Sequence, residues 1–426
     1  MAGRLKLTYP DDEQVSIRFS MNDLTSRPDV WRPSYEELRQ QGMPIRQLNP
    51  EMLVPPGGYE LLGSCPIAVQ ANFIPGGCLI SVCLNHSFFD GLGGAMAVGF
   101  WAENCKDLQN STHRTMYSDL EHLQRFDADL SQLGDAVGFK PLRLPNVLLD
   151  STAPHGEELK RIQGDRTLWQ LLGLQKPPTD PIAAWGSPTN KTMVSAIFVA
   201  SSQSILRLKA ESTSSGTEGD EEVAIPFVSS FDAIAALVWR CILRARYLDL
   251  EDPGMISSRL RIPINVRQIL GIPHDYHGNV LLNSMTETSV KSLIAEADRT
   301  QIAPKIRSSL IFGRDAKRVL DAIKLSFVLP DLASRRPLFS DTTRQDLVLT
   351  SWQDMPYYKH DWGPMFGCPG NPEFFRIPRG HLRGICALQP RRENDRTEIL
   401  VSLEQGQMDQ LKSDVEFTEY FELKAL

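Results

Sequence analysis

The sequence has few of the features that mark a secreted, membrane-spanning or metal-stabilised protein. Its seven cysteines are an odd number with no C-x-x-C pair, which disfavours a disulfide framework and a structural zinc site and predicts reduced, mostly buried thiols. It lacks an apolar run of about 18 residues, and residues 1–14 lack the apolar core of a signal peptide. We therefore expect a cytoplasmic protein with no membrane partner.

Basic residues are not in excess either. Lys and Arg total 45 against 52 Asp and Glu, for a formal net charge of −7, which argues against a nucleic-acid partner held by phosphate neutralisation. The basic stretch at residues 390–396 is typical of a charged turn between two strands. We therefore expect no nucleic-acid partner.

What the sequence does have is length and a mixture of strand and helix patterns. At 426 residues, 42 % of them hydrophobic, it exceeds one ordinary core, so two domains are expected. Apolar runs at 67–74 and 78–84 flank a Pro-Gly-Gly turn and predict a β-hairpin, whose nearly all-apolar second strand is expected to be central in its sheet. Further strands are predicted at 192–199, 260–265, 279–286, 347–352, 384–389 and 398–403, and helices at 35–41, after 92, from 201 or 202, after 229 or 230, over 289–325 and at 406–415. The rest of the first sixty or so residues is interpreted as irregular.

The decapeptide NHSFFDGLGG, residues 85–94, joins the second hairpin strand to a helix. A side chain at the carboxyl end of a strand, beside a glycine-rich turn and a helix N-terminus, lies where α/β folds usually place ligands. His86 and Asp90 are therefore candidates for chemistry. A histidine at the end of a buried strand can also simply hydrogen-bond a carbonyl group, and that alternative stays open on the residues alone.

Three other kinds of chemistry find little support at this junction. A dinucleotide fingerprint needs a third glycine where Met96 stands. Metal binding by His86 and Asp90 needs a further ligand, and among the other histidines only His274 and His277 are spaced as a pair. A serine hydrolase needs a G-x-S-x-G elbow, which does not occur. General base catalysis by a neutral imidazole, with a preorganised donor for an oxyanion, is the interpretation that remains.

The decapeptide carries an H-x-x-x-D-G motif, and the chain resembles the BAHD acyltransferases, especially their fungal secondary-metabolite branch of trichothecene 3-O-acetyltransferase-like enzymes. Four further segments match that family in order, over about 320 residues: 229–240, 264–267, 276–279 and 350–363. The resemblance implies an α/β (α+β) fold of two similar chloramphenicol-acetyltransferase-like domains. Each domain would be a mixed β-sheet flanked by helices, with a channel between them. The implied domains are 1–190, with the H-x-x-x-D motif, and 191–426, with a loop similar to D-F-G-W-G.

The resemblance also implies roles for the residues of the junction. His86 would deprotonate an acceptor as it attacks the thioester carbonyl of an acyl-CoA, with no covalent intermediate. Asp90, followed by Gly91, would point away from the channel and hold the loop by pairing with Arg267. On the acceptor side, Thr350 and Asn279 would bind substrate.

Two further segments carry implied roles. Trp352 would direct its indole N–H at the developing oxyanion, with ordinary core packing as the alternative. Asp361 and Gly363 match the start of the D-F-G-W-G loop, which is structural and far from the base, although positions 362, 364 and 365 depart from that motif.

The H-x-x-x-D motif lies about a fifth of the way along this chain, against about a third in the family. Part of the first domain is therefore expected to be absent, either because the beginning has been lost or because the first sheet is reduced.

The function implied by the resemblance is an acyl-CoA-dependent O-acyltransferase that acylates a hydroxyl of an apolar fungal secondary metabolite. Acetyl-CoA or another acyl-CoA would be the cosubstrate and a small molecule the acceptor. No permanently bound cofactor, no metal and a monomer are expected. Two alternatives remain: a condensation-domain-like enzyme that forms amides or esters on carrier-bound substrates, and a non-catalytic relative that serves as a binding module.

Overall fold

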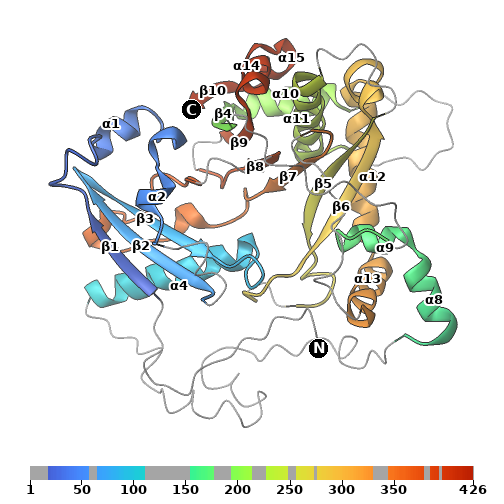
Figure 1. Ribbon diagram of the computed structural model, residues 1–426, viewed down its shortest axis with the longest axis horizontal. Helices are drawn as coiled ribbons and strands as arrows, with labels where there is room; N and C mark the ends of the chain where they lie inside the picture. The colour runs from blue at the N-terminus through green and yellow to red at the C-terminus, as the bar shows by residue number, and fades with distance from the viewer. Residues whose placement is uncertain are drawn as a thin grey trace, which may run out of the picture.

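The computed structural model describes residues 18–56, 65–110, 154–176, 193–213, 227–247, 256–272, 276–329, 344–378, 384–392 and 396–425. Within them the chain forms a three-stranded sheet from its first part and a seven-stranded sheet from its second part. Figure 1 shows the small sheet in blue at the left, and the large sheet with its layer of helices at the right. Mixed sheets covered by helices confirm the predicted α/β fold class.

The small sheet has the strand order β1-β2-β3. Its strands are β1 (Arg18–Asp23), β2 (Ile67–Ile74) and β3 (Gly77–Leu84). β1 runs parallel to β2, and β2 pairs with β3 as the predicted antiparallel hairpin. Gly76 in the connecting turn has a φ of 78°, a conformation that glycine adopts without strain.

Short helices and one long helix cover the two faces of the small sheet. On one face lie α1 (Tyr35–Gln40) and α2 (Pro50–Leu53). Between them, η1 (Ile45–Gln47) packs through Ile45 on the large sheet. The face under α1 and α2 is closed by a core of Leu24, Trp31, Leu38, Met43, Leu48, Leu53 and Ile74. On the other face α4 (Gly91–Gln109) packs through Val98 and Ala102.

β3 lies at the edge of the small sheet in the described part of the chain, so the prediction of a central strand is wrong. Contacts on both faces explain the sequence pattern, with each residue of β3 half-buried. Leu79 packs into the core beneath α1 and α2, whereas Ile80 and Val82 face α4. An edge strand with both faces covered has the same continuous apolar sequence as a central strand.

The large sheet has the order β10-β4-β9-β8-β7-β5-β6. In that order its strands are β10 (Glu422–Ala425), β4 (Met193–Ala200), β9 (Thr397–Glu404), β8 (Ile385–Leu388), β7 (Leu347–Ser351), β5 (Ser257–Asn265) and β6 (Leu281–Ser289). β7 runs parallel to β5 and to β8, and the other neighbours are antiparallel. Each strand predicted for this part of the chain is present. β1 and β10 were not predicted, since each is short and carries few apolar residues.

A layer of helices buries the outer face of the large sheet around α11 (Ser230–Tyr247). Apolar side chains at helical spacing are buried along it: Ile234, Leu237, Val238, Cys241 and Ile242. Trp239 Nε1 donates to Ser258 Oγ on β5 at 2.9 Å. Its neighbours are α10 (Ser202–Glu211), η2 (Ser292–Glu296), α12 (Arg299–Gly313), α14 (Gln405–Ser413) and α15 (Val415–Thr418). Among the described helices, none combines the length and apolarity that a membrane crossing requires.

Three helices lie beside strand β6 at the end of the large sheet. They are α8 (Gly156–Gly164), α9 (Arg166–Leu171) and α13 (Ala316–Val328). α9 contacts β6 and α13, and α8 contacts α13. The predicted domain boundary between residues 190 and 191 lies outside the described residues and stays a prediction.

The large sheet opens between β5 and β7. These two strands pair only at Leu260↔Leu347 and Arg261↔Val348, although β5 continues to Asn265 and β7 to Ser351. Pro263 follows the last pair on β5 and has no backbone N–H to donate to a ladder. The two strands therefore separate toward their carboxyl ends.

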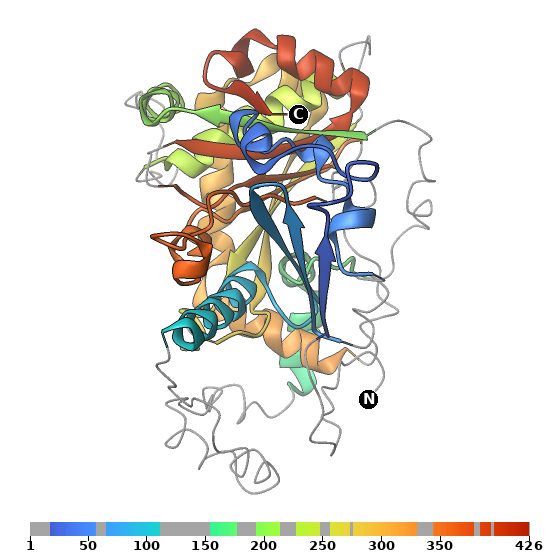
Figure 2. The same ribbon diagram turned by 90° about the vertical axis from the view of Figure 1, so that its left-hand side faces the viewer.

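Residues 352–378, called the crossing segment below, leave the large sheet and pack against the small one. Figures 1 and 2 show this orange segment beside the blue strands and α4. It contains η3 (Tyr357–Lys359) and η4 (Pro364–Phe366). Trp362 packs on α4, and Glu373 forms an ion pair with Arg39 at 2.6 Å. The second half of the chain therefore completes the core of the first.

Candidate active site

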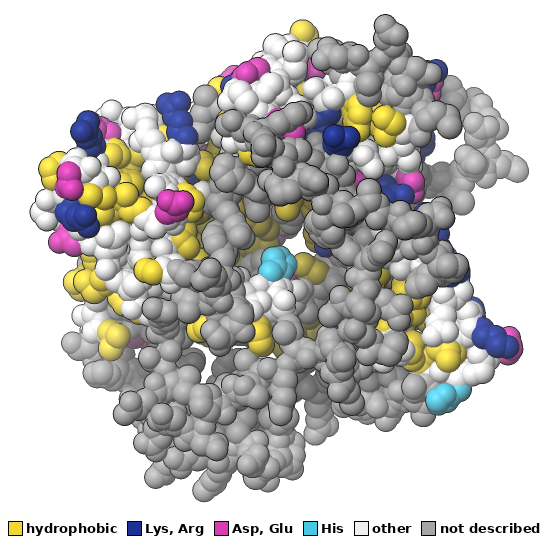
Figure 3. Space-filling model, viewed as in Figure 1, with side chains coloured by type: hydrophobic (Ala, Val, Ile, Leu, Met, Phe, Trp, Pro, Cys, Tyr) yellow, Lys and Arg dark blue, Asp and Glu magenta, His cyan; other side chains and the backbone are white. Residues whose placement is uncertain are grey.

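A cavity of about 2180 Å³ lies between the two sheets. Its walls include β3, the start of α4, the end of β7 and much of the crossing segment. Figure 3 shows this face of the molecule, with hydrophobic side chains gathered around a hollow between the two parts. The cavity brings together most of the predicted site residues: His86, Asp90, Gly91, Arg267, Asn279, Thr350 and Trp352.

His86 lies in the connection between the end of β3 at Leu84 and the start of α4 at Gly91. A tight turn precedes α4, in which the backbone N–H groups of Phe88 and Phe89 donate to the Asn85 carbonyl at 2.9 and 3.0 Å. The His86 side chain is exposed and lines the cavity. In the described part of the chain neither ring nitrogen has a protein hydrogen-bond partner, so both can meet a ligand.

Asp90 is buried behind His86, and its carboxylate is fully occupied. It forms a bidentate ion pair with Arg267 at 2.6 and 3.0 Å, with both side chains at most 2 % exposed. Its two oxygens also accept the backbone N–H groups of Gly93 at 2.9 Å, which caps α4, and of Val280 at 3.0 Å. A carboxylate has about four acceptor sites, and all four are filled here. Asp90 therefore holds the junction and has no free site with which to take a proton from His86.

The segment 276–280 closes over the start of α4 from the other half of the chain. Arg267 donates to the carbonyl oxygens of Tyr276 and Gly278 at 3.1 and 2.5 Å, and Phe89 forms an isolated β-bridge with Gly278. A Cβ at Gly93 would overlap the carbonyl oxygen of His277. Glycine is therefore required at this position by the close approach of the two backbones.

Asn279 lies in this segment, and its amide Nδ2 donates to the His86 carbonyl oxygen at 2.7 Å. The bond fixes the backbone that carries the imidazole. Asn279 also lines the cavity, so its predicted role in substrate binding stays a prediction.

Trp352 follows β7 and lies close to the start of α4. Its backbone N–H donates to the Leu388 carbonyl at 2.9 Å, and its indole meets the Phe375 ring edge-on at 5.8 Å. The indole N–H has no protein acceptor in the described part of the chain, and the side chain lines the cavity. A Cβ at Gly91 would overlap Met355 Cε and lie 3.4 Å from Trp352 Cδ1, so Gly91 lets these side chains reach the helix start. Thr350, two residues earlier on β7, lines the same wall.

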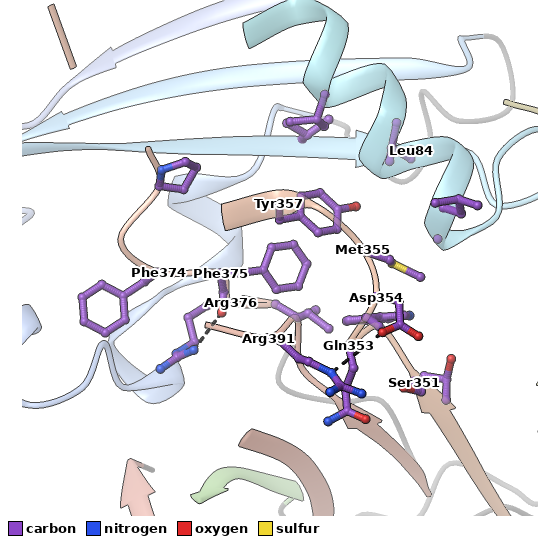
Figure 4. Close-up of a pocket in the computed structure, with 18 of the residues that line it drawn as sticks. Leu84, Ser351, Gln353, Asp354, Met355, Tyr357, Phe374, Phe375, Arg376 and Arg391 are labelled. Carbon is purple, nitrogen blue, oxygen red and sulfur yellow. Dashed lines mark hydrogen bonds and ion pairs between the residues drawn. The ribbon is translucent and has the colours of Figure 1, made fainter. Parts of the chain in front are cut away.

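Figure 4 shows an aromatic wall of the cavity that sequence reasoning missed. The rings of Tyr357 and Phe375 stack at 4.4 Å, beneath the end of β3 and α4. Burial raises the pKa of the Tyr357 hydroxyl, which therefore stays neutral at pH 7. Arg376 closes the wall by donating to the carbonyl oxygens of Gly42 and Met43 at 2.8 and 3.2 Å. Aromatic and basic residues in an irregular segment give no pattern from which this could be found.

Asp361 and Gly363 lie outside the cavity lining and hold the crossing segment to the far end of α4. Asp361 accepts the backbone N–H groups of Gly363 and Gly370 at 3.0 and 3.2 Å. It also pairs with Lys106 at 2.7 Å, which lowers the pKa of the carboxyl. Gln109, which the sequence did not single out, donates to the Trp362 carbonyl at 2.7 Å. Lys106 is fifteen residues beyond Gly91 on α4, about 22 Å along the helix axis.

The described residues contain no group of three or more His, Cys, Asp or Glu side chains placed to hold a metal ion. His274, half of the histidine pair noted in the sequence, lies outside the described residues.

Comparisons with known proteins cover nearly the whole chain. A family model described as the Transferase family matches residues 172–418. The eremophilane O-acetyltransferase prx11 of Penicillium rubens is 27 % identical over 431 residues, which cover 98 % of this chain and 84 % of that protein. The trichothecene 3-O-acetyltransferase TRI101 of Fusarium sporotrichioides is 24 % identical over 414 residues, or 95 % of this chain and 79 % of that protein.

A solved structure confirms the fold. The crystal structure of F. sporotrichioides TRI101 complexed with coenzyme A and T-2 aligns with a TM-score of 0.70 at 20 % identity. The alignment covers 96 % of this chain and 82 % of that chain. The two-sheet arrangement with helices is therefore shared with that enzyme.

Proposed function

The chain belongs to the Transferase family, and on that premise we propose that it is an acyl-CoA-dependent O-acetyltransferase acting on a hydroxyl of an apolar fungal secondary metabolite. Its relatives support the activity, since they are named as O-acetyltransferases of eremophilanes and trichothecenes. The structure of one relative holds coenzyme A and a small molecule together. Acetyl-CoA and a small-molecule alcohol are accordingly the proposed substrates.

The proposal rests on the hydrogen bonding of His86 and Asp90. The imidazole of His86 reaches the cavity with no protein hydrogen bond, while the carboxylate behind it is saturated by Arg267 and two backbone N–H groups. This arrangement gives a single base and no proton relay. A neutral imidazole at the wall of a cavity can serve as a general base near neutral pH.

The proposed reaction proceeds in one addition and one elimination. A ring nitrogen of His86 takes the proton of the acceptor hydroxyl as its oxygen attacks the thioester carbonyl carbon. The negative charge that develops on the carbonyl oxygen is met by the Trp352 indole N–H. When the C–S bond breaks, the coenzyme A thiolate leaves and takes the proton from the imidazolium. His86 returns to its neutral form, and an acetyl ester and free coenzyme A are released.

The walls of the cavity support an apolar acceptor. Beside the aromatic pair of Tyr357 and Phe375, the part under α1 and α2 is lined by Met43, Leu48, Leu53, Val54, Phe73 and Leu79. Such a surface suits a terpenoid or polyketide skeleton, whose hydroxyl groups are few. Thr350 and Asn279 are the proposed polar contacts, while Gly91, Asp361 and Gly363 have structural roles.

The test is acetyl transfer with the full chain. The protein is incubated with acetyl-CoA and a panel of sesquiterpenoid alcohols, and products are sought by mass spectrometry. His86→Ala is expected to lose activity about 10²–10⁴-fold, the usual contribution of a general base. His155→Ala is the matched control, because His155 is an exposed histidine that does not line the cavity.

Three results would contradict this proposal or favour one of its alternatives. A His86→Ala protein that folds normally and retains the wild-type rate overturns the general-base mechanism. Failure of the wild-type protein to bind coenzyme A favours a non-catalytic binding module. Transfer only from carrier-bound acyl groups favours a condensation-type enzyme.

A further inference from the structure

Tyr357 brings a hydroxyl group into the aromatic wall of the cavity. It is the first residue of η3 in the crossing segment, and it lines the cavity together with Leu84 and Phe375. We propose that the Tyr357 hydroxyl donates a hydrogen bond to a second oxygen of the acceptor, a carbonyl or ether oxygen of its skeleton. Alcohols that carry such an oxygen would then be selected over alcohols that lack it. The inference rests on the proposed function, because it concerns the acceptor of that reaction.

The Tyr357 hydroxyl has no protein hydrogen-bond partner in the described part of the chain. Two other tyrosines at the crossing segment differ in this respect. Tyr35 donates to Glu373 Oε2 at 2.8 Å. The hydroxyl of Tyr358 accepts the backbone N–H of Phe375 at 3.1 Å. A half-buried hydroxyl that lacks a partner is unfavourable in the free protein, and a ligand that supplies the partner gains by it. Tyr357 therefore has the hydrogen-bonding capacity to contact a bound molecule.

Two aromatic contacts fix the direction of this hydroxyl. The Tyr357 ring stacks on Phe375 at 4.4 Å and meets the His360 ring edge-on at 6.2 Å. Figure 4 shows the hydroxyl directed away from Phe374 and toward the side of the cavity where β3 ends. A ring held in this way loses little freedom when its hydroxyl binds a ligand. The contact is therefore preorganised.

The hydroxyl lies close to the group that is proposed to meet the oxyanion. A Cβ at Gly94 would lie 3.8 Å from the Tyr357 hydroxyl oxygen. A Cβ at Gly91 would lie 3.4 Å from Trp352 Cδ1, the carbon bonded to the indole nitrogen. Gly91 and Gly94 are three residues apart and share one face of α4, about one turn or roughly 5 Å along the axis. An alcohol that reacts beside Trp352 can therefore reach Tyr357 with an oxygen on the same ring or on a neighbouring ring.

The chemistry of the hydroxyl selects the class of acceptor. Burial raises the pKa of Tyr357, so the phenol keeps its proton near neutral pH. A neutral phenol donates its O–H to a carbonyl or ether oxygen, and the C–H groups of a hydrocarbon skeleton cannot accept it. The neighbouring side chains of Leu84 and Phe375 have no polar atoms that could take the proton instead. An alcohol with a ketone or ether oxygen is therefore the acceptor that completes this wall.

The test compares matched acceptors in three proteins. Each pair consists of a sesquiterpenoid alcohol with a ketone on its ring system and the same alcohol with a methylene group in place of the ketone. Pairs with the ketone at different ring positions are assayed with acetyl-CoA. For at least one pair, Tyr357→Phe is expected to lower kcat/KM for the ketone about 3–10-fold, the loss of one neutral hydrogen bond. The methylene partner and the KM for acetyl-CoA are expected to stay unchanged, because the ring and its stacking remain.

Tyr358→Phe is the matched control. Tyr358 is the next residue in the chain, its hydroxyl is occupied by the Phe375 N–H, and it does not line the cavity. Removing that hydroxyl disturbs the support of the wall without removing a group that faces the acceptor. We expect Tyr358→Phe to change both members of each pair by the same factor.

The outcomes separate this proposal from the proposed function. If Tyr357→Phe changes both members of every pair equally, or neither, the contact to a second oxygen is overturned even though the alcohols are acetylated. A loss confined to the ketone in Tyr358→Phe also overturns it. Binding of the same pairs without acetyl-CoA is measured by calorimetry. If the wild type binds the ketone more tightly than its methylene partner, and Tyr357→Phe abolishes that difference while no alcohol is acetylated, the contact stands and the proposed function fails.

Discussion

Replacing Arg267 by methionine is expected to destabilise the protein by about 3–5 kcal/mol, because it leaves a buried carboxylate without its cation. The pair is at most 2 % exposed on either side, so solvent cannot take over the role of the guanidinium. The same change removes the hydrogen bonds from Arg267 to the carbonyl oxygens of Tyr276 and Gly278. Two orphaned acceptors place the expected loss toward the upper end of that range.

The measurement is the midpoint and slope of urea unfolding, followed by tryptophan fluorescence. Arg391→Met is the matched control, since Arg391 is 65 % exposed and its ion pair with Asp354 spans 3.8 Å. We expect that control to change stability by less than about 1 kcal/mol. The double variant Asp90→Asn with Arg267→Met buries no charge and is expected to be more stable than Arg267→Met alone.

Two results would refute this reasoning. One is an Arg267→Met protein within about 1 kcal/mol of the wild type, which would mean that the buried pair contributes no more than an exposed one. The other is a double variant as unstable as the sum of its two single variants, because that would show that Asp90 and Arg267 act independently.

Three further predictions follow, two from contacts at the junction and one from a buried carboxyl group on the large sheet. Gly93→Ala is expected to lower stability by about 1–3 kcal/mol in thermal unfolding, because the new Cβ overlaps the His277 carbonyl oxygen; an unchanged melting temperature would contradict the close approach. Asn279→Ala removes the bond to the His86 carbonyl and is expected to lower kcat about tenfold with little change in the unfolding midpoint, whereas a change in KM alone would indicate a contact to substrate. Burial raises the pKa of Asp346 to about 6, so the folded state binds this proton more tightly than the unfolded state, and stability falls as pH rises from about 4 to about 6. Asp346→Asn is expected to flatten that dependence in unfolding curves recorded across this range, and parallel curves for the two proteins would contradict the assignment.

Local features of the site could be predicted from the sequence because they depend on neighbours in the chain. The end of the apolar run at Leu84, the acid at Asp90 and the glycines after it define a strand, a cap and a helix within a few residues. The matching segments at 264–267 and 276–279 marked the partners of this junction only through the family resemblance. From the residues alone, nothing relates Asp90 to Arg267, which lies 177 positions away.

What could not be predicted depends on how distant segments approach each other. The sequence of β3 predicts a central strand, but β3 lies at the sheet edge in the described part of the chain. An apolar sequence indicates contacts on both faces of a strand. It does not indicate whether another strand pairs beside it. The requirement for Gly93 arises only where the backbone of His277 meets the helix start.

The crossing segment has a consequence for how the protein is made. Arg39 pairs with Glu373, and Arg376 donates to the Gly42 carbonyl, so both contacts join positions 334 residues apart. Translation at roughly 5–20 residues per second would separate the synthesis of these partners by about 15–70 s. During that interval the strands of the small sheet have been made, but the crossing segment that packs against them has not. The strands of the small sheet are thus made well before the segment that completes their packing.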